Sequence, residues 1–162
     1  MAVSTTQSIW RSGGGDQTRT AYCGTGLMVA EFYFSATQTS GNVLNQAGGV
    51  PVILPANAVI VQINVNAAGT GGTNPTFDMG FTTYTGGTAT PAGLIDEGDA
   101  DVGKQVFDWA SATAGASMNA AMSATQMVYI TGRAGASAAT GGNISGDIIY
   151  YVNDPLVGQQ NV

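Results

Sequence analysis

The residues most able to do chemistry are four carboxylates in the short stretch "IDEGDADVGK": Asp96, Glu97, Asp99 and Asp101. Carboxylate oxygens are the ligands that Ca²⁺ prefers. The spacing does not match an EF-hand loop, which closes with a glutamate at its twelfth position. We therefore expect an exposed acidic loop without an essential metal, in which Asp96, Asp99 and Asp101 are the candidate ligands to test.

The same acids could serve an enzyme, such as a depolymerase working through the residues from Asp96 to Asp108. Carboxylates this close in sequence rarely face each other across a cleft, as a glycosidase pair must. The chain has no histidine, which removes Ser-His and Cys-His nucleophile pairs and the commonest zinc ligand. Its Gly-rich stretches lack the lysine and following helix of a phosphate-binding loop. The sequence therefore predicts no catalytic residue and no cofactor.

The charge balance narrows the range of partners. Charged residues make up 9% of the 162 residues, and the net charge is −6, against roughly 25% charged residues in an average domain. The four bases are Arg11, Arg19, Lys104 and Arg133, too few for the basic stripe that nucleic acid requires. An acidic chain is also repelled by anionic membranes. A charge-poor surface loses little on desolvation, which favours association with copies of itself or with another protein. A compositional bias toward small residues is the alternative explanation.

Two further features concern the compartment and the single thiol. The polar stretch "MAVSTTQSIWRSGGG" has no charged region followed by an apolar one, as a signal peptide has, so we expect no signal peptide and we expect synthesis and assembly in a cytoplasm. The single cysteine, Cys23, cannot form an internal disulfide, and a small buried hydrophobe is a simpler interpretation of it than a reactive thiol.

In the segments that must position these residues, apolar side chains recur at every second position. Alternation of apolar and polar residues recurs in short runs separated by Gly-rich turns, and no long helical pattern is present. We expect an all-β fold, an antiparallel jelly-roll-like β-sandwich of about eight short strands. The alternation assigns the following residues to its core: Phe32, Phe34, Val59, Val61, Ile63, Phe77, Met79, Phe81, Ile148 and Tyr150.

The chain divides into an extended N-terminal arm (1–25), a β-sandwich domain (26–155) and a C-terminal tail (156–162). The arm is polar and Gly-rich, and it cannot bury enough apolar surface to fold alone. Ile9 and Trp10 are candidate apolar anchors for a partner, with Arg11 and Arg19 as charged contacts. The alternative is that Trp10 packs back on its own domain.

Several segments resemble head proteins of tailed bacteriophages. The resemblance lies in "VIVQINVN", "PTFDMGF", "PAGLIDEGDADVG" and the closing hairpin "VYITGR…TGGNISGDIIYYV", and it covers residues 50–104 and 126–152. It implies a jelly-roll decoration, cement or minor head protein. Such a protein binds the outside of the capsid, on the lattice of the major capsid protein, and becomes part of a virion assembled in the host cytoplasm. It also implies a homo-oligomer, with a trimer expected because capsid lattices offer three-fold positions.

A second function stays open beside this one, namely a head-fibre or adhesin module that binds host-surface glycans. Sugar sites place aromatic rings beside polar side chains, and the candidates are Tyr84, Trp109 and Tyr151. Each of these aromatics also fits a core or an interface. An array of glycans would separate the two functions.

Overall fold

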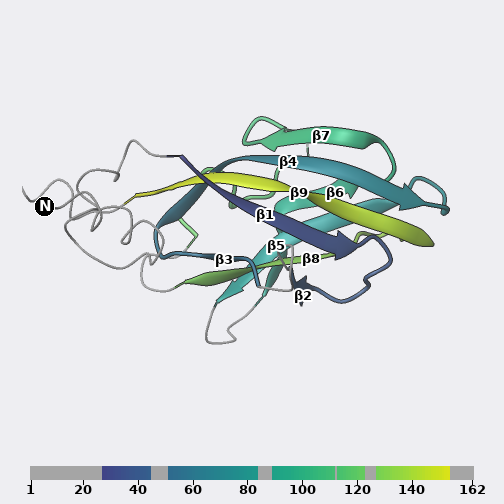
Figure 1. Cartoon of the computed structure of the whole chain (residues 1–162), viewed down its shortest axis with the longest axis horizontal. Coiled ribbons are helices and arrows are strands. Elements are labelled where there is room, and N and C mark those ends of the chain that lie inside the picture. The colour runs from purple at the N-terminus through teal and green to yellow at the C-terminus, as the bar shows by residue number, and fades with distance from the viewer. Residues whose placement is uncertain (1–26, 45–50, 84–88, 112, 123–126, 154–162) are drawn as a thin grey trace, which may run out of the picture.

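The described residues of the computed structural model, 27–44, 51–83, 89–111, 113–122 and 127–153, fold into nine β-strands and no helix (Figure 1). None of them belongs to a helix that could cross a membrane. The strands are β1 Met28–Ser35, β2 Asn42–Val43, β3 Ile53–Leu54, β4 Ala58–Thr70, β5 Thr76–Thr83, β6 Thr90–Asp99, β7 Gly103–Asp108, β8 Val128–Ala134 and β9 Gly141–Val152.

The strands form two antiparallel sheets in a jelly-roll arrangement. One sheet, here sheet A, has the order β1-β9-β4-β7, and the other, sheet B, has the order β2-β8-β5-β6 with β3 added beside β8. The pairs β1–β9, β2–β8, β4–β7 and β5–β6 are nested around the innermost hairpin β5–β6. This nesting is what a long antiparallel ladder gives when it rolls into two sheets. The predicted all-β sandwich is confirmed.

The core lies between the two sheets and is held by side chains from both. A row of three aromatic rings crosses the core. The ring centroid of Phe77 on β5 lies 6.2 Å from that of Phe34 on β1 and 6.0 Å from that of Phe107 on β7, and both pairs are edge to face. Edge-to-face pairs at this spacing add to the stability that burial alone supplies. Phe32, Ile63, Met79 and Ile148 are also buried as predicted, while Phe81 and Tyr150 are partly buried against the same cluster.

The predicted core face of β4 is wrong over its first half. Ile60 pairs with Tyr150 and Gln62 pairs with Ile149, so Val61 is an extra residue with no partner on β9. A β-bulge of this kind reverses which side chains face inward. Ile60 therefore occupies the core in place of Val61, which is only half-buried. Val59 is buried but lies outside the core cluster.

The β4–β5 turn shows why this sequence is rich in glycine. Gly71 and Gly72 have φ of 69° and 88°, and Asn74 has φ of 48°. These left-handed conformations are open to glycine and tolerated by asparagine, whereas most side chains avoid them. The Gly-rich stretch therefore forms a turn, as predicted, and lets β4 and β5 pass from one sheet to the other.

Candidate functional site

The acidic stretch does not form the predicted loop. Asp96, Glu97 and Asp99 lie within β6, and only Asp101 lies in the turn that leads to β7. All four side chains are exposed. The sequence prediction failed because "DEGDAD" lacks apolar alternation. The strand is instead held by its neighbours: Met79 of β5 pairs with Ile95, and residues 113–117 lie along its other edge.

The structure brings two of these acids together with a third that the sequence prediction missed. Asp78 on β5 lies beside Asp96 and Glu97, with one carboxylate oxygen from each within 4.8 Å of the others. Asp78 was missed because it stands singly in an alternating strand. Its proximity to β6 follows only from the β5–β6 pairing. Asp99 and Asp101 are outside this cluster, and the Oδ1 atom of Asp99 accepts a hydrogen bond from the Asp101 N–H.

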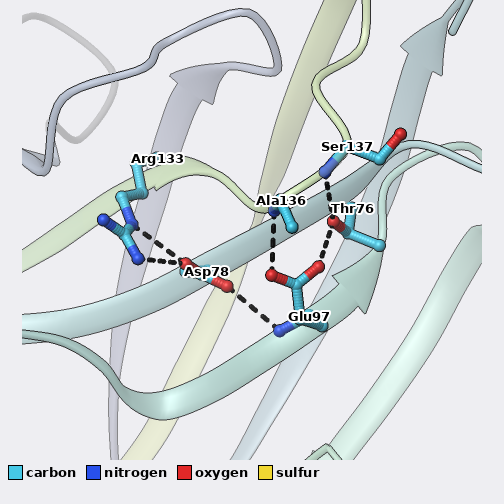
Figure 2. A network of polar contacts seen from close by, with 6 residues as sticks. All are labelled: Thr76, Asp78, Glu97, Arg133, Ala136 and Ser137. Atoms are coloured by element: carbon cyan, nitrogen blue, oxygen red, sulfur yellow. Dashed lines mark hydrogen bonds and ion pairs between the residues drawn. The ribbon is translucent and has the colours of Figure 1, made fainter.

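Asp78 is a buried carboxylate with a positive partner. Its side chain is 2% exposed, and its Oδ2 atom accepts hydrogen bonds from Nε of Arg133 at 2.9 Å and from Nη2 at 2.7 Å (Figure 2). The two residues are directly opposite on β5 and β8. A buried charge without such a partner would be very costly, so the pair explains how an acid can lie inside this face.

The second oxygen of Asp78 supports a bulge in β6. Because Phe77 pairs with Gly98 and Met79 pairs with Ile95, Asp78 stands opposite two residues. One of them, Glu97, has φ of 56°, a conformation that costs about 1 kcal/mol for a residue with a Cβ. The Glu97 N–H donates a 3.0 Å hydrogen bond to Asp78 Oδ1, which offsets that cost. Asp78 therefore fixes the course of β6.

Glu97 extends the network to the segment after β8. Its Oε2 atom accepts a hydrogen bond from the Thr76 hydroxyl, and its Oε1 atom accepts one from the Ala136 N–H at 2.8 Å (Figure 2). These bonds favour the ionised form, the Thr76 bond most, and with the charge of Arg133 they hold the pKa of Glu97 below its ordinary value of 4.5 despite partial desolvation. The carboxylate thus joins β5, β6 and the β8–β9 connection.

The geometry of this cluster suits a structural network better than a metal centre. Both oxygens of Asp78 and both of Glu97 already accept hydrogen bonds from protein donors. A Ca²⁺ ion takes six to eight oxygen ligands, several of them carboxylates, and it would have to compete with the guanidinium of Arg133 for Asp78. Only exposed Asp96 offers a carboxylate outside the network.

The acids outside the cluster also have hydrogen-bond partners close to them in sequence. The carboxyl of Asp99, acting as hydrogen-bond partner and nearby negative charge, raises the pKa of Asp101. At the end of β7, Oδ1 of Asp108 accepts bonds from the Ala110 N–H and the Ser111 hydroxyl. Asp108 belongs to sheet A and Asp96 to sheet B, so the acids suggested for a depolymerase are divided between the two sheets.

The outward face of sheet A carries a different polar arrangement. Nε2 of Gln62 donates to Oδ1 of Asn64 at 2.6 Å, and Nδ2 of Asn64 donates to Oδ2 of Asp147 at 2.7 Å. Glu31 of β1 stands directly opposite Asp147, so two carboxylates share one row. Large apolar side chains lie exposed beside this row: Val29, Tyr33 and Val106 are 63%, 51% and 60% exposed.

The predicted partner-binding residues lie outside the described residues: Ile9, Trp10, Arg11 and Arg19. The glycan candidate Tyr84 lies outside them as well. Of the other two glycan candidates, Tyr151 is half-buried on β9. Trp109, just after β7, is 70% exposed, so it does not lie in the core, and the interface remains as its alternative interpretation.

No protein-family model, curated protein or solved structure matches this chain.

Proposed function

We propose that the chain is a non-enzymatic structural protein of a bacteriophage virion, a decoration or cement protein that binds the outside of the head. The observation that carries the proposal is the jelly-roll order of the strands, β1-β9-β4-β7 and β2-β8-β5-β6, in a chain whose segments resemble phage head proteins. The matched segments span β3 to β6 and β8 to β9, so they cover most of the sandwich.

The chemistry of the acidic cluster supports a structural role. The most buried acid, Asp78, is bonded to Arg133 and to the Glu97 backbone, and Glu97 is bonded to Thr76 and Ala136. Carboxylates held in this way stabilise strands, whereas a general acid or a nucleophile must reach a substrate. A decoration protein needs a stable domain and surfaces that bind neighbouring subunits, and it needs no catalytic set.

The proposed anchor is the N-terminal arm, with Ile9 and Trp10 as apolar contacts and Arg11 and Arg19 as charged contacts. Binding would order a polar segment, so the contacts must exceed that entropy. A buried Trp can supply about 2 kcal/mol or more, as binding hot spots do. The partner is the lattice of the major capsid protein, and the resulting location is the virion.

The experiment removes residues 1–20 and mixes the protein with undecorated capsids of the phage that encodes it. We expect a folded β-domain by circular dichroism that no longer co-sediments with capsids. A Trp10→Ala, Arg11→Ala variant should lose most of the binding, whereas a Thr5→Ala, Thr6→Ala variant in the same arm should keep it. Full occupancy by the truncated protein would show that the arm is not the anchor.

Glycan binding is the second candidate, and the exposure of Trp109 favours it. An indole ring that is 70% exposed can stack on the apolar face of a sugar, and the neighbouring Asp108 supplies a hydrogen-bonding side chain. A glycan array probed with the wild-type protein and with Trp109→Ala tests this function. Signals that are lost in the variant would support the adhesin module over the decoration protein.

A further inference from the structure

In the described part of the chain the two sheets end in five edge strands, β1 and β7 of sheet A and β2, β3 and β6 of sheet B. The edges of sheet B are protected against pairing with another chain. The edge strand β6 contains Pro91 and carboxylates, and its pairing with β5 is irregular at two places. Residues 113–117 also cover it, through backbone bonds such as Asp96 N–H to Thr113 O and Gly115 N–H to Leu94 O, both 2.9 Å. The opposite edge, beside β8, consists of β2 and β3, which have two residues each. A sheet edge is usually protected by a proline, by charged side chains, by irregular pairing, by a covering segment or by a very short edge strand.

Of these protections sheet A has only charge, with Glu31 on β1 and with Lys104 and Asp108 on β7. Its edge strand β1 pairs with β9 over eight residues without a register shift, and it contains neither proline nor lysine. The other edge strand, β7, is six residues long. Among the described residues, no backbone group outside sheet A bonds to residues 28–34 or 103–107. Edges of this kind are templates for an added strand.

The two open edges are complementary to each other. β1 and β7 run in opposite directions, because three successive antiparallel pairings separate them. The β7 edge of one copy can therefore extend the β1 edge of another as a further antiparallel strand. In Figure 1 these edges lie at opposite sides of the sheet, from β7 at the top through β4 and β9 to β1.

One register of that pairing matches the outward side chains in order. If Glu31 of one copy stands opposite Lys104 of the next, Val29 stands opposite Val106. The same register places Tyr33 beside Val102, which lies in the turn before β7 and is 60% exposed. Glu31 and Lys104 are both exposed, and their charges are opposite. The four apolar side chains of this register are among the large hydrophobic residues that a single copy leaves exposed.

A self-pairing of two β1 strands matches less well. Centred on Glu31, it would bring two carboxylates together beside Asp147, which already stands opposite Glu31 within the chain. Like charges directly opposite each other destabilise a pair of strands. Lys104 is the only lysine of the chain, and in the β1–β7 register it lies opposite the edge carboxylate.

We propose that copies of this chain associate head to tail, with β1 of one copy pairing with β7 of the next in the register Val29–Val106, Glu31–Lys104 and Tyr33–Val102. Such an interface joins two different surfaces, so it forms a closed ring when the rotation between copies closes. The trimer that the resemblance to phage head proteins implies is one such ring. The interface rests on the strands themselves and is independent of the proposed capsid binding.

Charge exchange tests the interface in solution. Glu31→Lys and Lys104→Glu should each weaken association by about tenfold or more, because each places like charges opposite each other. The double variant should restore association to near the wild-type level. Light scattering gives the mass, which we expect to be three times the 16.3 kDa of the chain for the wild type and the double variant. A monomeric wild type, or single variants that associate as well as it does, would overturn the proposal.

Cysteine cross-linking tests the register. In a Cys23→Ser background, a Val29→Cys chain and a Val106→Cys chain, carrying different tags, are expressed together and oxidised. We expect a disulfide that joins the two tags, since a disulfide forms only where Cα atoms lie within about 7 Å. The control pair, Val29→Cys with Val102→Cys, is four residues out of register and should not link. Links of Val29→Cys chains only to themselves would show a β1–β1 interface and refute the proposal.

Capsid binding through the arm and ring formation through β1 and β7 can be refuted independently of each other. The chain truncated by residues 1–20 keeps both β1 and β7, so the ring should survive the loss of capsid binding. Conversely, Glu31→Lys should dissociate the ring without unfolding the chain, because the new lysine stands opposite Asp147 and forms a favourable cross-strand pair. An intact fold by circular dichroism confirms that the variant tests the interface.

Discussion

The outward faces of the two sheets use polar residues in opposite ways. On sheet B, Asp78 is buried and ion-paired with Arg133, and the network continues through Glu97. On sheet A, the row of Gln62, Asn64 and Asp147 is only part-buried, and apolar side chains lie exposed beside it. On sheet B the polar side chains hold irregular strands in place. Sheet A has regular edge strands, and its exposed side chains are available to a partner.

The largest expected difference between the two faces comes from Asp78→Ala. It leaves the guanidinium of Arg133 and the Glu97 N–H without their acceptor. We expect the free energy of unfolding to fall by about 2–3 kcal/mol, below the usual cost of breaking a buried ion pair because Arg133 is 37% exposed. Urea denaturation measures it as a lower midpoint at constant slope. Asp96→Ala, in the same cluster but exposed, should change stability by less than about 0.5 kcal/mol. Equal losses in the two variants would contradict the assigned role of Asp78.

Asn64→Ala tests the polar row of sheet A. The variant removes the acceptor of Gln62 and the donor to Asp147. Because these groups are part-buried and water can replace some of the bonds, we expect a loss of about 1–1.5 kcal/mol in the free energy of unfolding. Asn66→Ala is the matched control on the same strand and face, where the side chain is exposed. A loss of unfolding free energy as large as that of Asp78→Ala would contradict the difference inferred between the two faces.

Thr131→Val should raise stability on the outward face of sheet B. Within the described residues, the Thr131 hydroxyl is buried without a hydrogen-bond partner, and it lies on β8 opposite Gly80. Valine has the same shape and carries no polar group, so we expect a gain of about 0.5–1 kcal/mol in the free energy of unfolding. Thermal denaturation can measure it, with Thr131→Ser as the control that keeps the hydroxyl. A destabilised valine variant would mean that the hydroxyl makes a bond in solution.

The smallest effect expected is the pH dependence that Glu97 contributes. Its pKa is lowered in the folded chain, chiefly by the Thr76 hydroxyl, so the unfolded chain binds the proton more readily. The stabilisation is therefore complete above the ordinary pKa of 4.5 and is lost as the pH falls through the lower folded value. Glu97→Gln should flatten the stability profile in that acid window, and Thr76→Val should flatten it partly. A profile unchanged in both variants would refute the assignment.

Sequence periodicity was sufficient for the strands with an unbroken pattern. In β1, Phe32 and Phe34 alternate with exposed Val29 and Tyr33, because a regular strand places successive side chains on opposite faces. The same reasoning failed at Val61. A bulge shifts the alternation by one residue, and its position depends on the register with β9, which the local sequence does not contain. It also failed for β6, whose backbone is held by β5 and by residues 113–117.

The sequence by itself determined the class of fold, the Gly-rich turns and the lack of a histidine-based catalytic set, because these follow from composition and from local backbone preference. Only the tertiary structure decided which acids matter. Asp78, Glu97 and Arg133 are far apart in the chain, and they form one network because β6, β5 and β8 are neighbours in sheet B. It also decided that β1 and β7 are the open edges of sheet A. The reason is physical: strand pairing depends on long-range backbone hydrogen bonds, so the groups that it brings together cannot be found from their spacing in the chain.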